Sequence, residues 1–377
     1  MTKSSPKTAP IVHFLYEPGN GGLDRVAILL ANGMARRGIP TELWLTKASG
    51  PIAHMIAPEV IIRLVPTPKL GGRGTRLVLQ IPAVARMIRK HRPKVIFSAG
   101  NQTNLSVAAA RKLAGSTPTK IIQKFTNPVL RPGLGPWLKI YRKWRFGFTA
   151  RFADMCLSLS AAHAENYATI YPHAAGKFRY VPNPYVTPAM LNLGEDRTVR
   201  APDTAARLLA IGRIAPQKGY FTLLSALARI ADRPWSMTIL GDGHLRDDIA
   251  QLAKNLGLAD RIEFKGFVSD PTLDYAQSDI LILSSQWEGF PAVPIEAMAT
   301  GCSVVATDCS AGLTQLLRQI GHDTVPVQDP EALAKAIVAA IDAPQPIAPL
   351  RACADAFSIE NSIDRHLELS ELVCQAG

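Results

Sequence analysis

Two glutamates stand close together in the second half of the sequence, with seven residues between them. Glu288 falls in a loop rich in Gly and Pro, and Glu296 falls in the first turns of the helix predicted to follow. Carboxylate oxygens accept hydrogen bonds from hydroxyl groups, so the pair suits a ligand rich in hydroxyls. Backbone N–H groups near Ala292 and Val293 would point from the start of that helix toward an anion. Glu296 alone would serve to complement the helix dipole and Glu288 alone would be an ordinary surface residue, but together they favour a binding site.

A second candidate is a loop with two cations that runs from Gly212 to Gly219. Arg213 and Lys218 lie five positions apart, directly after an apolar run. Such a pair can converge on one diphosphate, with arginine as a planar fork and lysine as a point charge. The alternative is a solvated loop in which Lys218 only begins the next helix. The surrounding half of the chain is net acidic, which favours the functional interpretation, and the loop lacks the spacing of a P-loop.

Two further turns are rich in glycine and also follow apolar runs. Gly19, Gly21 and Gly22 lie within four positions, and Gly241 stands two positions before Gly243. Glycine permits positive φ and lets the backbone approach an anion closely. Neither turn has the G-x-G-x-x-G spacing of a dinucleotide fingerprint, and an ordinary tight turn explains each of them when it is taken alone.

These four loops need strands and helices to position them, and the sequence predicts an α/β fold. A strand at Ile11–Tyr16, a helix at Arg25–Arg37 and a strand at Thr41–Leu45 begin an alternation of apolar runs and helical stretches. The alternation returns in the second half at Arg207–Ile211, Phe221–Ile230, Ser236–Leu240, Asp247–Leu256, Ile262–Phe264, Ile280–Leu283, Ile295–Thr300 and Ser303–Ala306. The pattern is typical of two doubly wound parallel sheets in series. Ligands bind such sheets beyond the carboxyl ends of the strands, where the four loops are expected to lie.

The chain length of 377 residues fits two domains. The segment Asn183–Ala206 carries three prolines and several polar residues, so it is interpreted as a linker. We therefore predict an N-terminal domain at residues 1–185, a C-terminal domain at 186–350 and a terminal helix within 351–377 that packs back toward the first domain.

Neither a membrane span nor a signal peptide is predicted. The sequence has no run of eighteen apolar residues, and the first apolar run is not followed by a small-residue cleavage pattern. The five cysteines are scattered and form no C-x-x-C pair, so neither a disulfide framework nor a metal site is expected. A reducing, cytoplasmic setting is the simplest interpretation.

Charge is divided unequally between the two halves of the chain. Residues 1–190 hold 27 Lys and Arg against 6 Asp and Glu, whereas residues 191–377 hold 15 against 24. The first half therefore carries a net charge of +21 and calls for an anionic partner. Nucleic acid, an anionic membrane surface and a phosphorylated substrate are all compatible with that charge.

Much of the aromatic and cationic character of the first half lies in the predicted helix Arg131–Phe152. Its aromatic residues recur every three or four positions, so they form one stripe with several cations away from it. Such a helix is typical of binding to a membrane surface, and a second basic cluster at Arg86–Lys94 strengthens that interpretation. The alternative is an ordinary core-facing helix with a solvated basic side. The residues assigned to the membrane or the acceptor are Trp137, Lys139, Tyr141, Arg142, Lys143, Trp144 and Arg145.

Taken together, the four loops in this order resemble those of the retaining GT-B glycosyltransferases of the glycogen-synthase-like family four. The most specific element is Glu288 to Glu296, supported by Gly212–Gly219 and by the turn at Gly21 and Gly22. The resemblance implies two Rossmann-like domains facing across a cleft, the C-terminal one binding a nucleotide-sugar donor. It also implies retention at the anomeric carbon with no metal and no cofactor. A UDP-sugar is the favoured donor, with GDP-mannose as the alternative.

The resemblance assigns roles to individual residues. Arg213 and Lys218 would hold the donor diphosphate, Glu288 the donor sugar and Glu296 the ribose hydroxyls. The Gly21–Gly22 turn would close over the phosphates. The full set of expected donor contacts is Gly21, Gly22, Gly212, Arg213, Lys218, Gly241, Phe267, Val268, Glu288, Gly289, Phe290, Pro291, Ala292, Val293 and Glu296, with Phe267 and Val268 against the base.

The sequence departs from the family pattern at two places. Many relatives carry a histidine after the fourth N-terminal strand, but here the strand at Val95–Phe97 leads to Asn101. Asn101 is therefore assigned as the substitute catalytic residue, beside Glu288, Arg213 and Lys218. Pro294 removes one N–H from the start of the helix that carries Glu296.

A basic, aromatic N-terminal domain suits a glycan acceptor carried by a lipid, in particular a polyprenyl diphosphate. We therefore expect a hexosyltransferase of bacterial lipopolysaccharide or exopolysaccharide synthesis, peripheral on the inner face of the cytoplasmic membrane. A nucleotide-sugar epimerase of the same shape is one alternative, and the paired glutamates speak against it. A nucleic-acid-binding protein is another, and the sequence lacks helix-turn-helix, zinc and RNP patterns.

Overall fold

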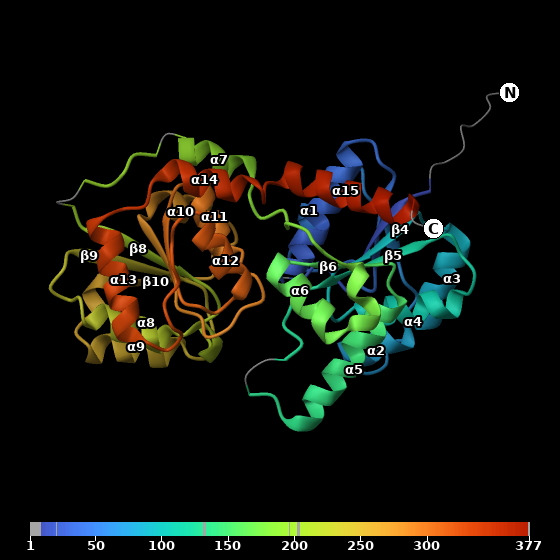
Figure 1. The fold of residues 1–377 in the computed structure, drawn as a ribbon, viewed down its shortest axis with the longest axis horizontal. Coiled ribbons are helices and arrows are strands. Elements are labelled where there is room, and N and C mark those ends of the chain that lie inside the picture. Colours follow the sequence, from blue (N-terminus) through green and yellow to red (C-terminus); the bar gives the residue numbers. More distant parts are fainter. Residues whose placement is uncertain (1–8, 20, 131–132, 196, 202–203, 376–377) are drawn as a thin grey trace. The chain divides into compact units, whose positions relative to one another are not determined.

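The computed structural model describes residues 9–19, 21–130, 133–195, 197–201 and 204–375. The chain divides into two compact units, one of Met1–Pro184 with Ile359–Gly377 and one of Tyr185–Ser358. Each unit is a parallel sheet with helices packed on its two faces (Figure 1). The predicted fold class, two doubly wound α/β domains, is confirmed.

The first unit contains a seven-stranded parallel sheet in the order β3-β2-β1-β4-β5-β6-β7. Its strands are β1 (Ile11–Leu15), β2 (Thr41–Leu45), β3 (Ile61–Leu64), β4 (Val95–Ser98), β5 (Lys120–Phe125), β6 (Met155–Ser158) and β7 (Phe178–Tyr180). The order of the first four strands reverses between β1 and β4, so their carboxyl ends form the switch point at which doubly wound sheets bind ligands.

Side-chain alternation along β1 divides the helices of this unit between two faces. Phe14 points into a core with α3 and α4, whereas Leu15 packs against α1 on the other face. The helices are α1 (Gly22–Arg36), α2 (Arg73–Leu79), α3 (Ile81–His91), α4 (Asn104–Ala114), α5 (Pro136–Phe152), α6 (Ala161–Ile170) and α15 (Ile359–Gln375), with 3₁₀ turns at Ala53–Met55 and Pro172–Lys177. α2, α3, α4 and α5 form one layer of neighbouring helices (Figure 1).

The last helix, α15, is part of the first unit although it follows the whole second unit in sequence. It packs against α1, and Ile363, His366 and Leu369 on its inner face are buried. The contact is close because Gly33 of α1 has no side chain: a Cβ there would lie 2.0 Å from Cδ1 of Ile363.

The second unit contains a five-stranded parallel sheet in the order β10-β9-β8-β11-β12. Its strands are β8 (Ala206–Ile211), β9 (Trp235–Leu240), β10 (Ile262–Gly266), β11 (Ile280–Leu283) and β12 (Ser303–Ala306). Its helices are α7 (Pro188–Glu195), α8 (Tyr220–Ala228), α9 (Arg246–Asn255), α10 (Thr272–Gln277), α11 (Val293–Ala299), α12 (Ala311–Gln319), α13 (Pro330–Asp342) and α14 (Ile347–Asp355), with 3₁₀ turns at Pro216–Lys218 and Ala259–Arg261.

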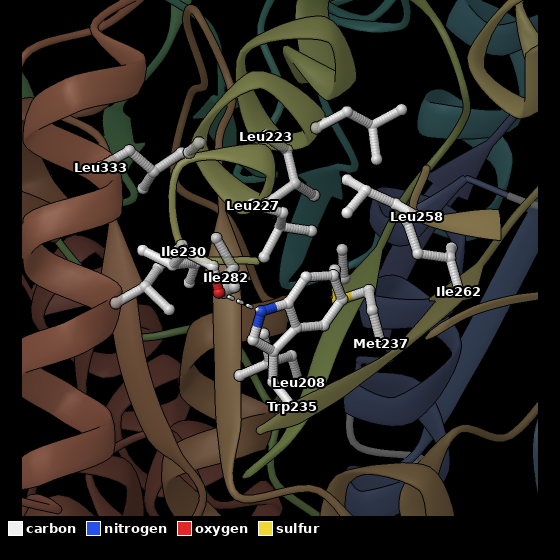
Figure 2. Packing of buried hydrophobic residues seen from close by; sticks show 14 of the residues in the cluster. Leu208, Leu223, Leu227, Ile230, Trp235, Met237, Leu258, Ile262, Ile282 and Leu333 are labelled. Carbon is white, nitrogen blue, oxygen red and sulfur yellow. Dashed lines mark hydrogen bonds between the residues drawn. The ribbon is translucent and has the colours of Figure 1, made fainter. Parts of the chain in front are cut away.

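Trp235 lies in the core of this unit beside Met237 and aliphatic side chains of α8 (Figure 2). Its indole N–H donates to the carbonyl of Ile230 at 2.8 Å, which satisfies the only polar atom of the ring. The guanidinium of Arg261 stacks 3.7 Å from the ring centroid. The sheet that carries the candidate site therefore packs against a hydrophobic core in which the polar atom of Trp235 is paired.

Two local predictions were wrong. The segment interpreted as a linker contains α7, which begins at Pro188, where proline's fixed φ suits the first turn, and packs on α10, α11 and α14. The single terminal helix is broken after α14, because Phe357 is buried and its carbonyl accepts the N–H groups of Tyr185 and Val186, both at 3.0 Å.

Candidate active site

Three loops of the second unit meet backbone to backbone at the carboxyl end of its sheet. Gly219, with φ of +66°, lies so close to β11 that a Cβ would approach the carbonyl oxygen of Ser284 to 2.0 Å. At Gly241, with φ of +129°, a Cβ would lie 2.1 Å from the carbonyl oxygen of Gly212. Glycine is required at both positions for space and for backbone conformation. The predicted loops after β8, β9 and β11 therefore form one continuous edge.

The carboxylate of Glu288 is surrounded by donors from two of these loops. Lys218 Nζ lies 2.7 Å from Oε1, and Ser285 Oγ donates to the same oxygen at 3.0 Å. Gln217 Nε2 donates to the other oxygen, Oε2, at 3.4 Å and to the carbonyl of Trp287 at 2.9 Å. The Lys218 and Glu288 side chains are 20% and 13% exposed, so the pair is largely shielded from water without being sealed from a ligand.

The backbone around Glu288 is fixed as firmly as its carboxylate. Its N–H donates to the carbonyl of Cys309 at 2.7 Å, and Ser310 Oγ donates to the carbonyl of Gly289 at 2.7 Å. On the other side, the N–H of Gln286 donates to the carbonyl of Gln217, also at 2.7 Å. These bonds hold the carboxylate in place before any ligand arrives, which is the condition for electrostatic preorganisation.

Other expected donor contacts lie exposed on the same loops. Arg213 is exposed and donates to no acceptor among the described residues, so its guanidinium is available to an anion. Phe267 follows β10 directly and is 70% exposed, with Val268 beside it partly buried. An exposed aromatic ring at the carboxyl end of a strand suits stacking against a base.

Glu296 has a different environment from Glu288. It lies in α11, is only 8% exposed, and accepts a hydrogen bond from the hydroxyl of Tyr275 at 2.6 Å. The Phe290 side chain stacks between Tyr185 and Phe357, with its ring centroid 6.4 and 5.5 Å from theirs. It is therefore part of the core, and only the backbone of Phe290 remains for a donor contact.

In the first unit, the loops after β1, β4 and β5 line a pocket of about 290 Å³. Gly21, Gly22, Arg73, Asn101 and Thr126 are among its lining residues. Asn101 Nδ2 donates to Thr126 Oγ1 at 3.3 Å, whereas its Oδ1 is buried with no hydrogen-bond partner. Asn101 therefore lines the pocket with one buried, unpaired acceptor, at the place where the sequence predicts the substitute for the family's histidine.

Asp24 is a pocket residue that the sequence analysis did not select. Its carboxylate packs under the glycine turn, where a Cβ on Gly19 or Gly21 would lie 2.8 or 3.0 Å from Oδ2. Burial raises the pKa of Asp24, and the positive charge of Arg73 opposes the rise. Gln217, Ser285 and Arg73 were also not selected, because their roles depend on neighbours that are distant in sequence.

Helix α5 exposes its aromatic stripe and turns two of its cations inward. Trp137 is 85% exposed and Trp144 58% exposed, so this stripe is not the core-facing side of the helix. Arg142 instead donates to the carbonyls of Pro128 and Val129, both at 2.8 Å, and Arg145 donates to the carbonyl of Asn101 at 3.1 Å. The alternative of a core-facing helix with a solvated basic side is therefore wrong, because the stripe is exposed and the long side chains of Arg142 and Arg145 reach loop carbonyls that need donors. The predicted start of this helix at residues 131–132 lies outside the described residues.

Among the residues that the structure describes, none of the helices combines the length and the apolar character of a membrane span. No group of three or more His, Cys, Asp and Glu side chains in the described part of the chain has the arrangement of a metal site.

Two family models match most of the sequence. The model of glycosyl transferases group 1 matches residues 205–343, which contain Lys218, Glu288 and Glu296. The model of glycosyltransferase family 4 matches residues 20–187, which contain the pocket of the first unit and α5.

Individual proteins extend this comparison. The N-acetylgalactosamine-N,N'-diacetylbacillosaminyl-diphospho-undecaprenol 4-alpha-N-acetylgalactosaminyltransferase of Campylobacter jejuni is 24% identical over 307 residues, 80% of this chain and 82% of that protein. The lipopolysaccharide core biosynthesis glycosyltransferase LpsE of Rhizobium meliloti is 34% identical over 137 residues, 36% of this chain and 39% of that protein. Other curated relatives match over 14% to 60% of their own length. The crystal structure of HepE from Anabaena with UDP and glucose has a TM-score of 0.74 at 19% identity, covering 96% of this chain and 99% of that one.

Proposed function

This chain belongs to the group 1 glycosyltransferases of family 4, and we propose that it transfers a hexose from a UDP-sugar to a lipid-linked or polysaccharide acceptor. Its two Rossmann-like units have the GT-B architecture. The observation that carries the proposal is the Lys218–Glu288 pair, at 2.7 Å, on the edge of the sheet where a donor binds in doubly wound folds.

The second unit supplies the groups that a nucleotide sugar needs. Glu288 would accept hydrogen bonds from sugar hydroxyls, and Arg213 and Lys218 would neutralise the diphosphate. Lys218 has three N–H donors and uses one on Glu288, which leaves two for phosphate oxygens. Phe267 would stack on the base. HepE, with the same fold, was solved with UDP and glucose, which supports UDP as the nucleotide.

The chemical step follows from this charge distribution. Negative charge develops on the diphosphate as the bond to the anomeric carbon breaks, and Lys218, held by Glu288, together with Arg213 would stabilise it without a metal ion. Each such contact is worth about 3 kcal/mol in a transition state. We propose retention at the anomeric carbon, as the family resemblance implies, with Asn101 on the acceptor side of the reaction.

Two observations support the proposed acceptor, namely the exposed aromatic residues of the first unit and the names of two relatives. The Campylobacter jejuni relative is named for an acceptor on diphospho-undecaprenol, and the Rhizobium meliloti relative for the lipopolysaccharide core. The exposed tryptophans of α5 suit a membrane-bound substrate. We therefore propose bacterial cell-surface glycan synthesis on the cytoplasmic side of the membrane.

The test is nucleoside diphosphate release from UDP-, GDP- and ADP-sugars in EDTA, with and without bacterial lipid extract. The expected result is release from one donor, dependent on lipid and lost in Glu288→Gln. Lys335→Ala is the matched control, because Lys335 also pairs with a glutamate at 2.7 Å but on the exposed face of α13. Release that survives Glu288→Gln, or that is abolished by EDTA alone, would contradict the proposal.

A further inference from the structure

A second hollow adjoins the pocket of the first unit, in the layer formed by α2, α4 and α5. It is a groove of about 540 Å³ lined by Arg73, Val78, Leu105, Tyr141 and Arg145, among others. Arg73 and Gln102 line both the groove and the pocket that contains Asn101. The two hollows therefore meet at Arg73 and Gln102.

The two arginines of the groove have unused donors. Arg73 donates to no acceptor among the described residues, and its guanidinium rests 4.8 Å above the ring of Tyr16. Arg145 donates one N–H to the carbonyl of Asn101. No acidic side chain lines the groove. Arg73 lies near the carboxylate of Asp24 but makes no ion pair with it, so both guanidinium forks keep donors that suit a phosphate or diphosphate group.

The walls of the groove suit an apolar chain. Val78 is 51% exposed and Tyr141 47% exposed, so both side chains leave apolar surface in contact with water. Trp144 follows Tyr141 along α5, with the two ring centroids 6.2 Å apart. An apolar strip thus begins beside the two arginines and continues onto the surface of α5.

The layer around the groove is cationic throughout. Residues 60–153, which form β3, α2, α3, α4 and α5 with the strands between them, include 19 Lys and Arg, of which Lys124 is buried, and no Asp or Glu. A surface of this charge attracts phosphate-bearing lipids from an anionic membrane. The charge, the apolar strip and the arginines together favour an amphiphile over a soluble anion.

We propose that this groove binds the diphosphate and the first part of the hydrocarbon chain of a polyprenyl diphosphate lipid, with Arg73 and Arg145 on the diphosphate. The inference rests on the proposed function, since it assigns the lipid part of the acceptor to named residues. The glycan of such a lipid would then extend from Arg73 into the adjoining pocket, toward Asn101.

The test is flotation of the full chain with phosphatidylcholine vesicles that contain polyprenyl diphosphate, polyprenol, or phosphatidylglycerol at matched surface charge. The wild type is expected to bind the polyprenyl diphosphate vesicles about tenfold more tightly than either other kind. Arg73→Gln and Val78→Asp should lose that preference. Both side chains are exposed and make no internal hydrogen bond in the described structure, so folding should be retained.

The matched control is Arg86→Gln, which removes one positive charge from exposed α3 in the same layer but outside the groove. It should lower binding to all anionic vesicles slightly and keep the preference for polyprenyl diphosphate. Equal binding to the polyprenyl diphosphate and phosphatidylglycerol vesicles, or equal effects of Arg73→Gln and Arg86→Gln, would overturn the proposal in favour of general attraction to anionic membranes. Binding of UDP is measured in the same variants: its absence in the wild type would contradict the proposed donor, whereas lipid preference tests the groove alone.

Discussion

Lys218 Nζ and Glu288 Oε1 lie 2.7 Å apart although seventy positions separate the two residues in sequence. The contact joins the loop after β8 to the loop after β11, which are neighbouring strands in the sheet. The cation proposed for phosphate and the carboxylate proposed for sugar hydroxyls are thereby held at a fixed separation. The functional proposals for the second unit all depend on this pair.

Lys218→Met and Glu288→Gln should each reduce turnover by about 10²-fold or more, because each removes a preorganised charge from the transition state. Lys218→Met should lower the free energy of unfolding by only about 1–3 kcal/mol, since Ser285 and Gln217 still donate to Glu288. Steady-state kinetics and urea unfolding would measure the two effects. The double variant should be no less active than the worse single variant; losses that multiply would show that the residues act independently.

Gly219→Ala should destabilise the second unit much more than Gly257→Ala. Both glycines have left-handed φ, +66° and +71°, but a Cβ at Gly257 meets nothing within 4 Å. Gly257→Ala should therefore lower the free energy of unfolding by about 1 kcal/mol, from the backbone conformation alone. Gly219→Ala adds a clash with Ser284 and should lower it by about 3 kcal/mol or more. Equal midpoints of urea unfolding would show that the two loops are not in contact.

Gln217→Glu should make activity depend on pH in a new way. It places a second carboxylate beside Glu288, in the position of an amide that donates at 3.4 Å. Like charges raise the pKa of the pair, so one carboxyl becomes protonated on acidification and donates to the other. Activity should be low at pH 8 and recover toward pH 5. Gln217→Met is the control and should show no such recovery; a parallel profile for both variants would refute the role assigned to Gln217.

The stability of the first unit should rise with pH above neutrality because of Lys124. This ammonium is buried and donates to Asn183 Oδ1 at 2.7 Å, and burial lowers its pKa from 10.5 to about 7. Between those values the unfolded chain binds the extra proton, so the free energy of unfolding increases with pH by a few kcal/mol in total. Lys124→Met should remove this increase in urea titrations. If the free energy of unfolding still increases with pH in Lys124→Met, the effect comes from other groups.

The stability of the first unit should also depend on pH in a second, acidic range. Burial, with a smaller contribution from the charge of Lys124, lowers the pKa of His13 from 6.5 to about 3. The unfolded chain therefore binds more protons between these values, and stability should fall as pH decreases from 6.5 toward 3. His13→Phe would remove the imidazole and keep its stacking on Phe97, whose ring centroid is 5.0 Å away.

The loops of the second unit could be predicted because their chemistry is local. Glu288, Lys218 and Arg213 stand out by residue type beside glycines that follow apolar runs, and parallel strands bring the carboxyl ends together. Gln217 and Ser285 could not be selected in this way. Their role is to donate to Glu288, and that contact exists only after β8 and β11 have become neighbours.

Helix α5 shows that periodicity alone leaves the orientation of a helix open between a core-facing and a surface-facing apolar stripe. The stripe of aromatic residues suggests one apolar face, but the buried residues are Phe146, Thr149 and Ala150. The rotation of α5 about its axis is also set by Arg142 and Arg145, which donate hydrogen bonds to backbone carbonyls of distant loops. The prediction of a linker around α7 is wrong for a related reason, since packing against three helices outweighs the low helix propensity of a proline-rich segment.

The return of α15 to the first unit determines the order in which the chain can be completed during synthesis. Strands β1 to β7 leave the ribosome first, but Gly33 and its neighbours on α1 stay uncovered until Ile363 has been added. The second unit can fold while the first still lacks its closing helix. A nonsense mutation at residue 359 would therefore damage the N-terminal unit and spare the unit encoded next to the lesion.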